Sequence, residues 1–292
     1  METFREILDP GFLLRNSVYV GLLVGLACPL VGTYVIMRRW IFTGVALPQV
    51  SSLGIAFAFA LHTWLGISHF EGSEQGLALA GSVTATILAI LLLAFMERRG
   101  KGIVEGRIGT LYALGGAWSV LLLLKNPYGE HGLLDRLKGE IIAVSDSDLI
   151  ISGSAFAVVL LLLFFFHKEL LLVSFDREMA ITLKKNVLLW DIILYLIVGI
   201  TISVAVLSVG PLVTFGFLII PALAAHSISR SMRQFAIISA TIGLLTAFFG
   251  FALAYKYDLP VGPTDVALLG VILALVFLGN QLKGLLSPNR NA

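Results

Sequence analysis

Polar side chains interrupt one of the most apolar parts of the sequence, in the stretch GVALPQVSSLG at residues 44–54. Here Gln49, Ser51 and Ser52 offer an amide and two hydroxyls, which can hydrogen-bond a passing solute or give oxygen ligands to a cation. Pro48 removes a backbone donor, and an amide without a partner in hydrocarbon is costly. The stretch therefore predicts a break in a helix, a polar site, or both.

Histidines form the second set of candidate metal ligands, because neutral imidazole is a common ligand of divalent ions. Three of the five occur near glutamates in segments expected to be outer loops: His62, His69 and His131, with Glu71, Glu74 and Glu130. This grouping fits either a metal site on the outer side or ordinary solvated loops. His226 ends a later apolar stretch, where a cation is favoured at a helix C-terminus.

The sequence lacks the residue motifs that several kinds of chemistry require. No G-x-x-x-x-G-K-[ST] motif is present, so the chain has no P-loop of its own for ATP. Neither an H-E-x-x-H motif nor a serine–histidine or paired-aspartate arrangement occurs within an apolar stretch, which argues against a third alternative, a membrane-embedded enzyme or assembly scaffold.

Charged residues are also missing from the centres of the apolar stretches, whereas proton-coupled carriers usually keep one there. Asp191 and Asp265 lie near the ends of stretches, where they are interpreted as interfacial carboxylates at helix starts. A secondary carrier or channel that works without ATP is the alternative function, and the absence of central charges counts against it.

The elements that must position these residues are membrane spans. The chain is 58% hydrophobic and 13% charged, whereas a soluble domain carries about 25% charged residues. The net charge of +2 gives no sign of the basic surface typical of nucleic-acid-binding proteins. Nine apolar stretches approach the roughly 20 residues needed to cross a bilayer: 17–37, 41–61, 77–96, 108–124, 149–166, 189–208, 210–226, 234–254 and 264–282.

Two of these stretches contain helix breakers. The second is predicted to be interrupted at Gly44 and Pro48, and the seventh is short and predicted to be broken at its glycine and prolines, Pro211, Gly216 and Pro221. We therefore predict an all-α polytopic bundle of eight or nine transmembrane helices, forming one domain over residues 1–292 with spans from about 17 to 282.

Lysine and arginine set the expected orientation, because cytoplasmic loops are enriched in them. With nine crossings and the N-terminus outside, fourteen of the twenty basic residues fall in inner segments. The six in outer segments are Arg5, Arg15, Lys125, Arg136, Lys138 and Lys256. The predicted location is the cell membrane, with the N-terminus outside and the C-terminus in the cytoplasm.

The longest inner segment, HKELLLVSFDREMAITLKKNVLLWD, is predicted to contain a short helix at about residues 174–186. Ser174 or Asp176 can cap its start, with Glu178 in the first turn. Lys184 and Lys185 are expected in the last turn, before Asn186. Met179 and Leu183 would form a small apolar face. Such a helix fits either docking into a partner's groove or lying on lipid headgroups.

This segment and the spans after it resemble the ABC-3 family, the membrane permeases of zinc, manganese and iron ABC importers. The family's L-x-x-x-F-D-x-E-x-A motif is matched by Phe175, Asp176, Glu178 and Ala180. Its V-G-x-L-L-V-x-A-L-L-I-x-P-A-x-x-A motif is matched by Val209, Gly210, Leu212, Val213, Leu218, Ile219, Pro221, Ala222 and Ala225. Three further segments are similar to the family in the same order: GRIGTLYALGGAWSVLLL, KGEIIAVSDSDL and YKYDLPVGPTDVAL.

The resemblance implies a cobalamin-permease-like fold and a homodimer of two permeases. It also implies two cytoplasmic ATPase subunits that hold ATP and Mg²⁺, and an extracytoplasmic solute-binding protein. Residues 174–186 would be the coupling helix to the ATPase, including Phe175, Asp176, Glu178, Met179 and Ala180.

The resemblance also bears on residues 41–50, because the family's second span begins S-L-I-G-D-A-L-S-H-A. This sequence has Val45 at the family's Asp and Gln49 at its His, two residues that in the family line the path and can ligate the ion. Valine offers no ligand, and a neutral amide oxygen is a weak one.

Three interpretations of the stretch follow. The first is a polar lining for a different substrate, such as a metal chelate or small organic molecule. The second is a bare metal ion passed by transient contacts with Thr43, Gln49, Ser51 and Ser52. In the third, which is compatible with both, Gln49 satisfies backbone freed by Pro48 and the two serines bond to carbonyls one turn earlier.

Overall fold

A computed structural model of the chain describes residues 12–64, 74–98, 104–124 and 144–286. Regular secondary structure in these ranges is entirely helical: α2 (Arg15–Met37), α3 (Ile41–Trp64), α4 (Glu74–Arg98), α5 (Val104–Leu124), α7 (Asp146–Phe165), α8 (His167–Phe175), α9 (Arg177–Thr182), α10 (Val187–Val209), α11 (Pro211–Ile228), α12 (Met232–Tyr257) and α13 (Val261–Leu286). All of the described helices except α8 and α9 are long and apolar enough to cross a membrane, which gives nine candidate spans. The predicted all-α polytopic bundle is confirmed, with the larger of the two predicted span counts.

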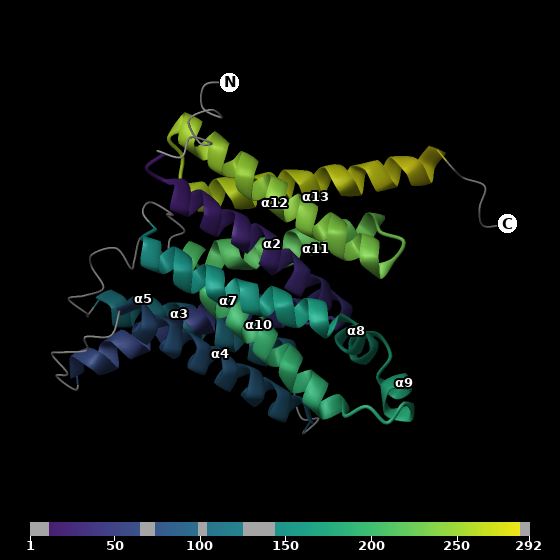
Figure 1. The fold of residues 1–292 in the computed structure, drawn as a ribbon, viewed down its shortest axis with the longest axis horizontal. Helices are drawn as coiled ribbons and strands as arrows, with labels where there is room; N and C mark the ends of the chain where they lie inside the picture. Colours follow the sequence, from purple (N-terminus) through teal and green to yellow (C-terminus); the bar gives the residue numbers. More distant parts are fainter. Residues whose placement is uncertain (1–11, 65–73, 99–103, 125–143, 287–292) are drawn as a thin grey trace.

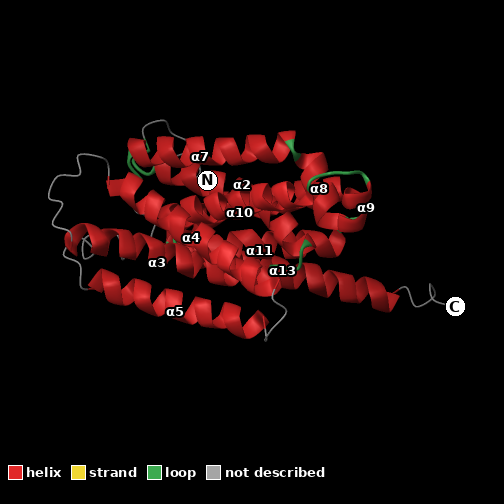
Figure 2. Cartoon of the chain, turned by 90° about the horizontal axis from the view of Figure 1, so that it is seen from below, coloured by secondary structure: helices red, strands yellow, loops and turns green. Residues whose placement is uncertain are grey.

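Helices α2, α10 and α11 occupy the middle of the bundle. In Figure 1, α12 and α13 lie on one side of them and α3, α4 and α5 on the other. Figure 2 places α7 and α5 at opposite edges. The short helices α8 and α9 lie together at one end of the bundle, between α7 and α10 in the chain.

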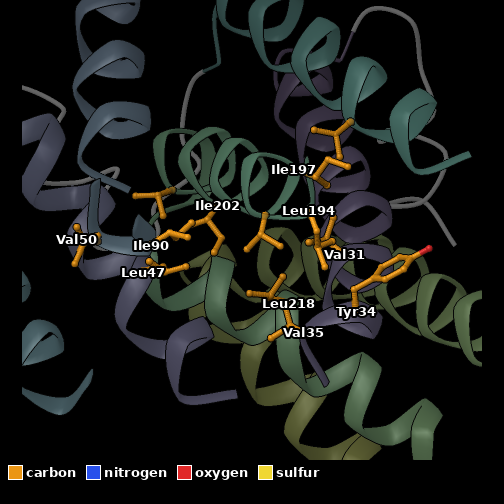
Figure 3. Packing of buried hydrophobic residues seen from close by; sticks show 14 of the residues in the cluster. Val31, Tyr34, Val35, Leu47, Val50, Ile90, Leu194, Ile197, Ile202 and Leu218 are labelled. Atoms are coloured by element: carbon orange, nitrogen blue, oxygen red, sulfur yellow. The ribbon is translucent and has the colours of Figure 1, made fainter. Parts of the chain in front are cut away.

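The main buried cluster joins six of the spans: α2, α3, α4, α7, α10 and α11. Figure 3 shows Val31 of α2 beside Leu194 of α10 and Val35 of α2 beside Leu218 of α11, with Leu47 of α3 near Ile90 of α4. Lipid tails are as apolar as these side chains, so close packing rather than hydrophobic transfer holds spans together in a bilayer.

Small residues let the central helix α2 touch its neighbours through backbone atoms. A Cβ added at Gly25 would lie 2.7 Å from the carbonyl oxygen of Gly243 in α12, and one at Gly32 would overlap the carbonyl oxygen of Leu218 in α11. Because a methyl group does not fit at either contact, these two glycines set how closely α2 approaches α11 and α12.

The predicted interruption at Gly44 and Pro48 is wrong, because α3 runs through both residues as one helix. Pro48 is buried within the helix, and Ser52 Oγ donates to its carbonyl oxygen at 3.1 Å. Gly44 lies against Leu218 and Ile219 of α11. Neighbouring helices and a local hydroxyl thus support a proline that would weaken an isolated helix.

The predicted break in the seventh stretch is also wrong, because α11 is continuous over 18 residues. Pro211 is the first residue of the helix, where a missing N–H has no consequence. Gly216 packs against Val266 of α13, and Pro221 lies inside the helix. The expected shortness is correct, since 18 residues rise only about 27 Å.

Candidate functional site

Thr43 lines a cavity of about 290 Å³ at the end of the bundle where α3 begins. The cavity lies between the α2–α3 corner and helices α4, α5 and α10, and its walls include Leu47, Ile90 and Tyr195. Among the predicted path residues, Thr43 is the one that faces this cavity, so its hydroxyl is available to a solute there.

Val45 and Gln49 lie one turn apart on a half-buried stripe of α3. Helix α5 packs against Gln49: a Cβ at Gly116 would lie 3.2 Å from Gln49 Oε1, and one at Gly115 would lie 3.1 Å from the Gln49 carbonyl carbon. Glycine on α5 thus leaves room for the amide between the two helices.

Ser51 and Ser52 point elsewhere, because both are fully buried. Ser51 Oγ lies 2.6 Å from Ser82 Oγ of α4, so the expected bond from Ser51 to a carbonyl one turn earlier is wrong. The same expectation is confirmed for Ser52, which donates to the Pro48 carbonyl. Both hydroxyls already have partners within the bundle.

The five predicted path residues therefore do not form one cluster. Thr43 lines the cavity, Gln49 faces α5, Val45 is half-buried one turn before it, and Ser51 and Ser52 are used in helix packing. Their assignment to a substrate path stays a prediction, with Thr43, Val45 and Gln49 the three that are not fully buried.

The predicted inner helix exists as α9, which is shorter than predicted and follows α8 directly at Asp176. Asp176 caps α9 as expected, since its Oδ1 accepts from the Met179 N–H at 2.8 Å, and Glu178 lies in the first turn. Phe175 and Met179 are 77% and 53% exposed, whereas Ala180 is fully buried. The segment thus presents apolar side chains outward from an anchored helix.

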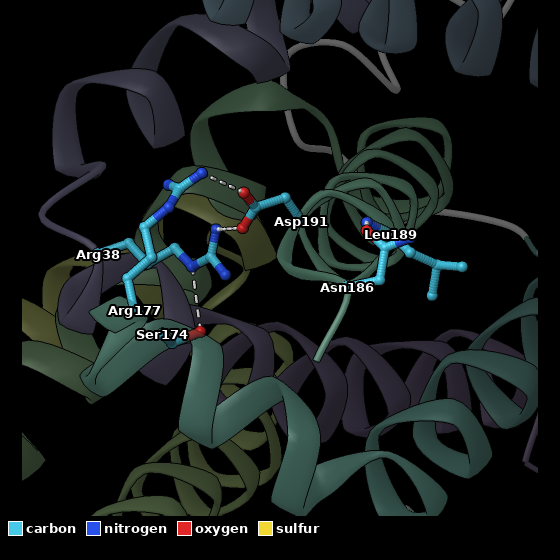
Figure 4. A network of polar contacts seen from close by, with 6 residues as sticks. All are labelled: Arg38, Ser174, Arg177, Asn186, Leu189 and Asp191. Carbon is cyan, nitrogen blue, oxygen red and sulfur yellow. Dashed lines mark hydrogen bonds and ion pairs between the residues drawn. The ribbon is translucent and has the colours of Figure 1, made fainter. Parts of the chain in front are cut away.

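The end of this helix differs from the prediction. Helix α9 stops at Thr182, so Lys184 and Lys185 lie beyond it, with Lys184 in the left-handed region at φ 54°. Asn186 does not end α9 but caps the start of α10, where its Oδ1 accepts from the Leu189 N–H at 3.2 Å (Figure 4).

The histidines supply no metal site in the described part of the chain, which contains no group of three or more His, Cys, Asp or Glu side chains suited to a metal ion. His62 was predicted in an outer loop but lies in the last turn of α3, whereas His226 lies in the last turn of α11, as predicted. His69, His131, Glu71 and Glu130 lie outside the described residues.

A charged cluster at the α9 end of the bundle was missed by the sequence analysis. Asp191 lies near the start of α10, as predicted, but beyond its first turn, and its side chain is buried. Its Oδ1 accepts from Arg38 Nη1 at 2.6 Å and its Oδ2 from Arg177 Nη2 at 3.0 Å, while Arg38 Nε donates to Ser174 Oγ at 3.0 Å (Figure 4). The sequence signal for this cluster was Asp191 itself, a single acid in an apolar stretch on the side of the bundle rich in arginine.

Asp265 likewise lies near the start of its span, as predicted, but is buried. It lies beyond the first turn of α13, is 2% exposed, and packs against Gly250 of α12. Its Oδ1 has no hydrogen-bond partner among the described residues.

Residues 12–280 match the ABC 3 transport family. The "Probable iron transport system membrane protein" of Haemophilus influenzae is 27% identical over 271 residues, which are 92% of this chain and 90% of that protein. The "Manganese transport system membrane protein MntD" of Bacillus subtilis is 29% identical over 287 residues, which are 92% of this chain and 93% of that one.

A solved structure, PsaBC from Streptococcus pneumoniae in complex with Fab, has a similar fold. The TM-score is 0.80 at 23% identity, and the aligned region covers 94% of each chain. The arrangement of spans described above is therefore shared with that protein over nearly its whole length.

Proposed function

We propose a cargo and a set of partners for this chain on the premise that it belongs to the ABC 3 transport family, as a membrane-spanning transport subunit. The proposed cargo is a divalent metal ion, with manganese and iron the leading candidates. The observation that carries this proposal is the match of more than nine-tenths of the chain to proteins named as iron and manganese transport membrane proteins.

Energy is proposed to come from a separate ATPase on the cytoplasmic side. The absence of a P-loop supports this, and so does α9, whose exposed Met179 and adjacent Phe175 offer apolar contacts at one end of the bundle. The ATPase would hold ATP and Mg²⁺, and this chain would hold neither. A second copy of the chain and an extracytoplasmic solute-binding protein complete the proposed assembly.

Weak binding along the path is compatible with this function, because an ion must also leave each site. Thr43 and Gln49 would offer a hydroxyl and an amide oxygen, and Val45 would offer no ligand. This set also supports a second candidate, a permease for a metal chelate or other organic solute, in which the polar groups bind the carrier molecule and not the ion.

The test is uptake by proteoliposomes that contain the permease, its ATPase and its solute-binding protein. We expect ATP-dependent accumulation of Mn²⁺, a dimeric permease by mass measurement, and no ATP hydrolysis by the 292-residue chain alone. Nucleotide hydrolysis by the isolated chain would contradict the proposal that a separate ATPase hydrolyses ATP. Uptake of a chelate without uptake of the free ion would replace the metal cargo with the second candidate.

A further inference from the structure

Asp191 connects three parts of the chain that are far apart in sequence. Arg38 is the residue after α2, Arg177 is the first residue of α9, and Asp191 lies in α10. Both arginines bind the same carboxylate, one at each oxygen. Figure 4 shows the two guanidinium groups approaching Asp191 from the same side of α10.

The two ion pairs differ in how firmly they are held. The side chains of Arg38 and Asp191 are 8% and 7% exposed, and the Arg38 guanidinium also lies 4.9 Å from the centre of the Trp40 ring. Arg177 is 61% exposed. A buried pair is costly to separate, whereas an exposed partner exchanges with water at little cost. The bond from Arg177 is therefore the one that can open.

Arg38 has a further N–H donor that could bind Asp191 once the bond from Arg177 opens. Its Nε binds Ser174 and its Nη1 binds Asp191, but its Nη2 is buried without a hydrogen-bond partner among the described residues. When Arg177 leaves Oδ2 of Asp191, that oxygen can accept from Arg38 Nη2, which would give the two-bond arrangement that arginine and carboxylate favour. The cluster thus has two hydrogen-bonding states, with Arg177 bound or withdrawn.

The cluster also borders the cavity that contains Thr43. A second cavity of about 540 Å³ lies under α8 and α9 and includes Ser174, Arg177 and Asp191 in its wall. Four residues line both cavities: Arg38, Arg39, Trp40 and Tyr195. The Trp40 ring stacks on the Tyr195 ring at 4.8 Å and 12°. These shared residues give a shift of Arg38 a physical route to the α2–α3 corner that carries Thr43.

We infer that Asp191 is a positioning residue that couples movement of α9 to the α2–α3 corner, through exchange between Arg177 and Arg38. This inference rests on the proposed function, since it requires an ATPase that moves α9. In this mechanism the coupling segment has two states. When Arg177 withdraws, the hydrogen bonds between Asp191 and Arg38 change, and the cavity at Thr43 changes shape.

The test uses the assembled permease–ATPase complex with a reporter cysteine, Thr43→Cys, in a Cys28→Ala background; Cys28 is the single cysteine of the chain and is buried. The rate of maleimide labelling is measured without nucleotide and after trapping with ATP and vanadate. We expect trapping to change the rate about fivefold or more. Arg177→Gln should abolish the change, whereas Arg177→Lys should retain it because lysine keeps one bond to Oδ2.

Arg38→Lys separates this mechanism from a simple need for positive charge. Lysine lacks the paired donors of arginine, so we expect the nucleotide-dependent change to be lost although the charge is kept. Arg233→Gln is the matched control, because Arg233 is an exposed arginine on α12 outside the cluster. It should behave like the parent.

A full nucleotide-dependent change in Arg177→Gln would overturn the inference, and so would an equal loss in Arg177→Gln and Arg233→Gln. A parent complex that binds the ATPase but shows no change at Thr43→Cys would overturn it while leaving the proposed function intact. Failure of the permease to bind any ATPase would overturn both.

Discussion

Two glycines of α2 differ in what a methyl group would meet. A Cβ at Gly32 would overlap the backbone of Leu218 in α11, whereas a Cβ at Gly21 would meet no atom within 4 Å. We therefore expect Gly32→Ala to lower stability by about 1–3 kcal/mol through overpacking, because a backbone carbonyl cannot move aside as a flexible side chain can.

Thermal unfolding of the purified permease in detergent measures this difference. Gly21→Ala is the matched control on the same helix, and its melting temperature should be unchanged or slightly higher. Equal melting temperatures for the two variants would mean that α2 and α11 are further apart than described.

The pair Val45 and Gln49 is the residue-scale test of the substrate path. Val45→Asp together with Gln49→His supplies a carboxylate and an imidazole one turn apart, a combination that suits Zn²⁺ or Mn²⁺. If these positions line the path, the double variant should change Mn²⁺ uptake or create measurable Zn²⁺ binding by calorimetry.

No effect on uptake or binding would remove both positions from the path. Tight binding of a dication by the unmodified permease, lost in Gln49→Ala, would instead restore an ordinary metal site at the amide. The single variants serve as controls, since each adds one ligand and should bind metal more weakly than the pair.

At the scale of elements, the continuity of α3 and α11 shows that a proline in a sequence does not by itself end a membrane helix. Pro48 and Pro221 both lie inside unbroken helices, and Gly44 near the first of them is packed against α11. Proline and glycine in the sequence mark positions where a helix is less stable, and packing against neighbouring helices decides whether the helix breaks there.

Helix α9 is the element on which the proposed ATPase contact depends. Met179→Asp replaces a half-exposed apolar side chain with a charge, and Glu178→Lys reverses the charge of its neighbour. Both should weaken ATPase binding by about tenfold, since loss of an anchoring contact in an interface removes about 1 kcal/mol or more. The permease should remain folded because neither side chain is buried.

Co-purification with the ATPase and thermal unfolding provide the two measurements. Leu259→Asp is the control, because Leu259 is also half-exposed but lies between α12 and α13, at the other end of the bundle from α9. Normal ATPase binding and normal stimulation of hydrolysis in the Met179 and Glu178 variants would show that α9 is not the docking element.

For the whole molecule, the bundle fixes which segments share a side of the membrane. The end of α13 and the short helix α9 lie at the same end in Figure 1, while α2 begins at the opposite end. Together with the excess of arginine and lysine in the segments around α9, this arrangement supports a cytoplasmic C-terminus.

Cysteine labelling tests this topology in a Cys28→Ala background. A membrane-impermeant maleimide should label Leu259→Cys in intact cells and Lys184→Cys only after the membrane is opened. The reverse pattern would invert the molecule and move α9 away from the ATPase. Labelling of both positions in intact cells would contradict the assignment of α10, α11 and α12 as three successive crossings.

The sequence alone determined the membrane class, the order of the spans and the absence of a P-loop. It narrowed the span count to eight or nine and the cap of the inner helix to Ser174 or Asp176, and the structure decided both. These features depend on composition, hydropathy and residues a few positions apart, which act locally. The resemblance to the ABC-3 family was also visible in the sequence, and the family is confirmed over residues 12–280.

Only the tertiary structure decided the partners of side chains from distant helices. Arg38 and Asp191 are 153 positions apart in the chain, and Ser51 and Ser82 are 31 apart. No local pattern specifies such contacts, because they arise from the packing of α2 on α10 and of α3 on α4. For the same reason the fate of Pro48, the burial of Asp265 and the division of residues 43–52 among a cavity, α5 and α4 became visible only in the assembled bundle.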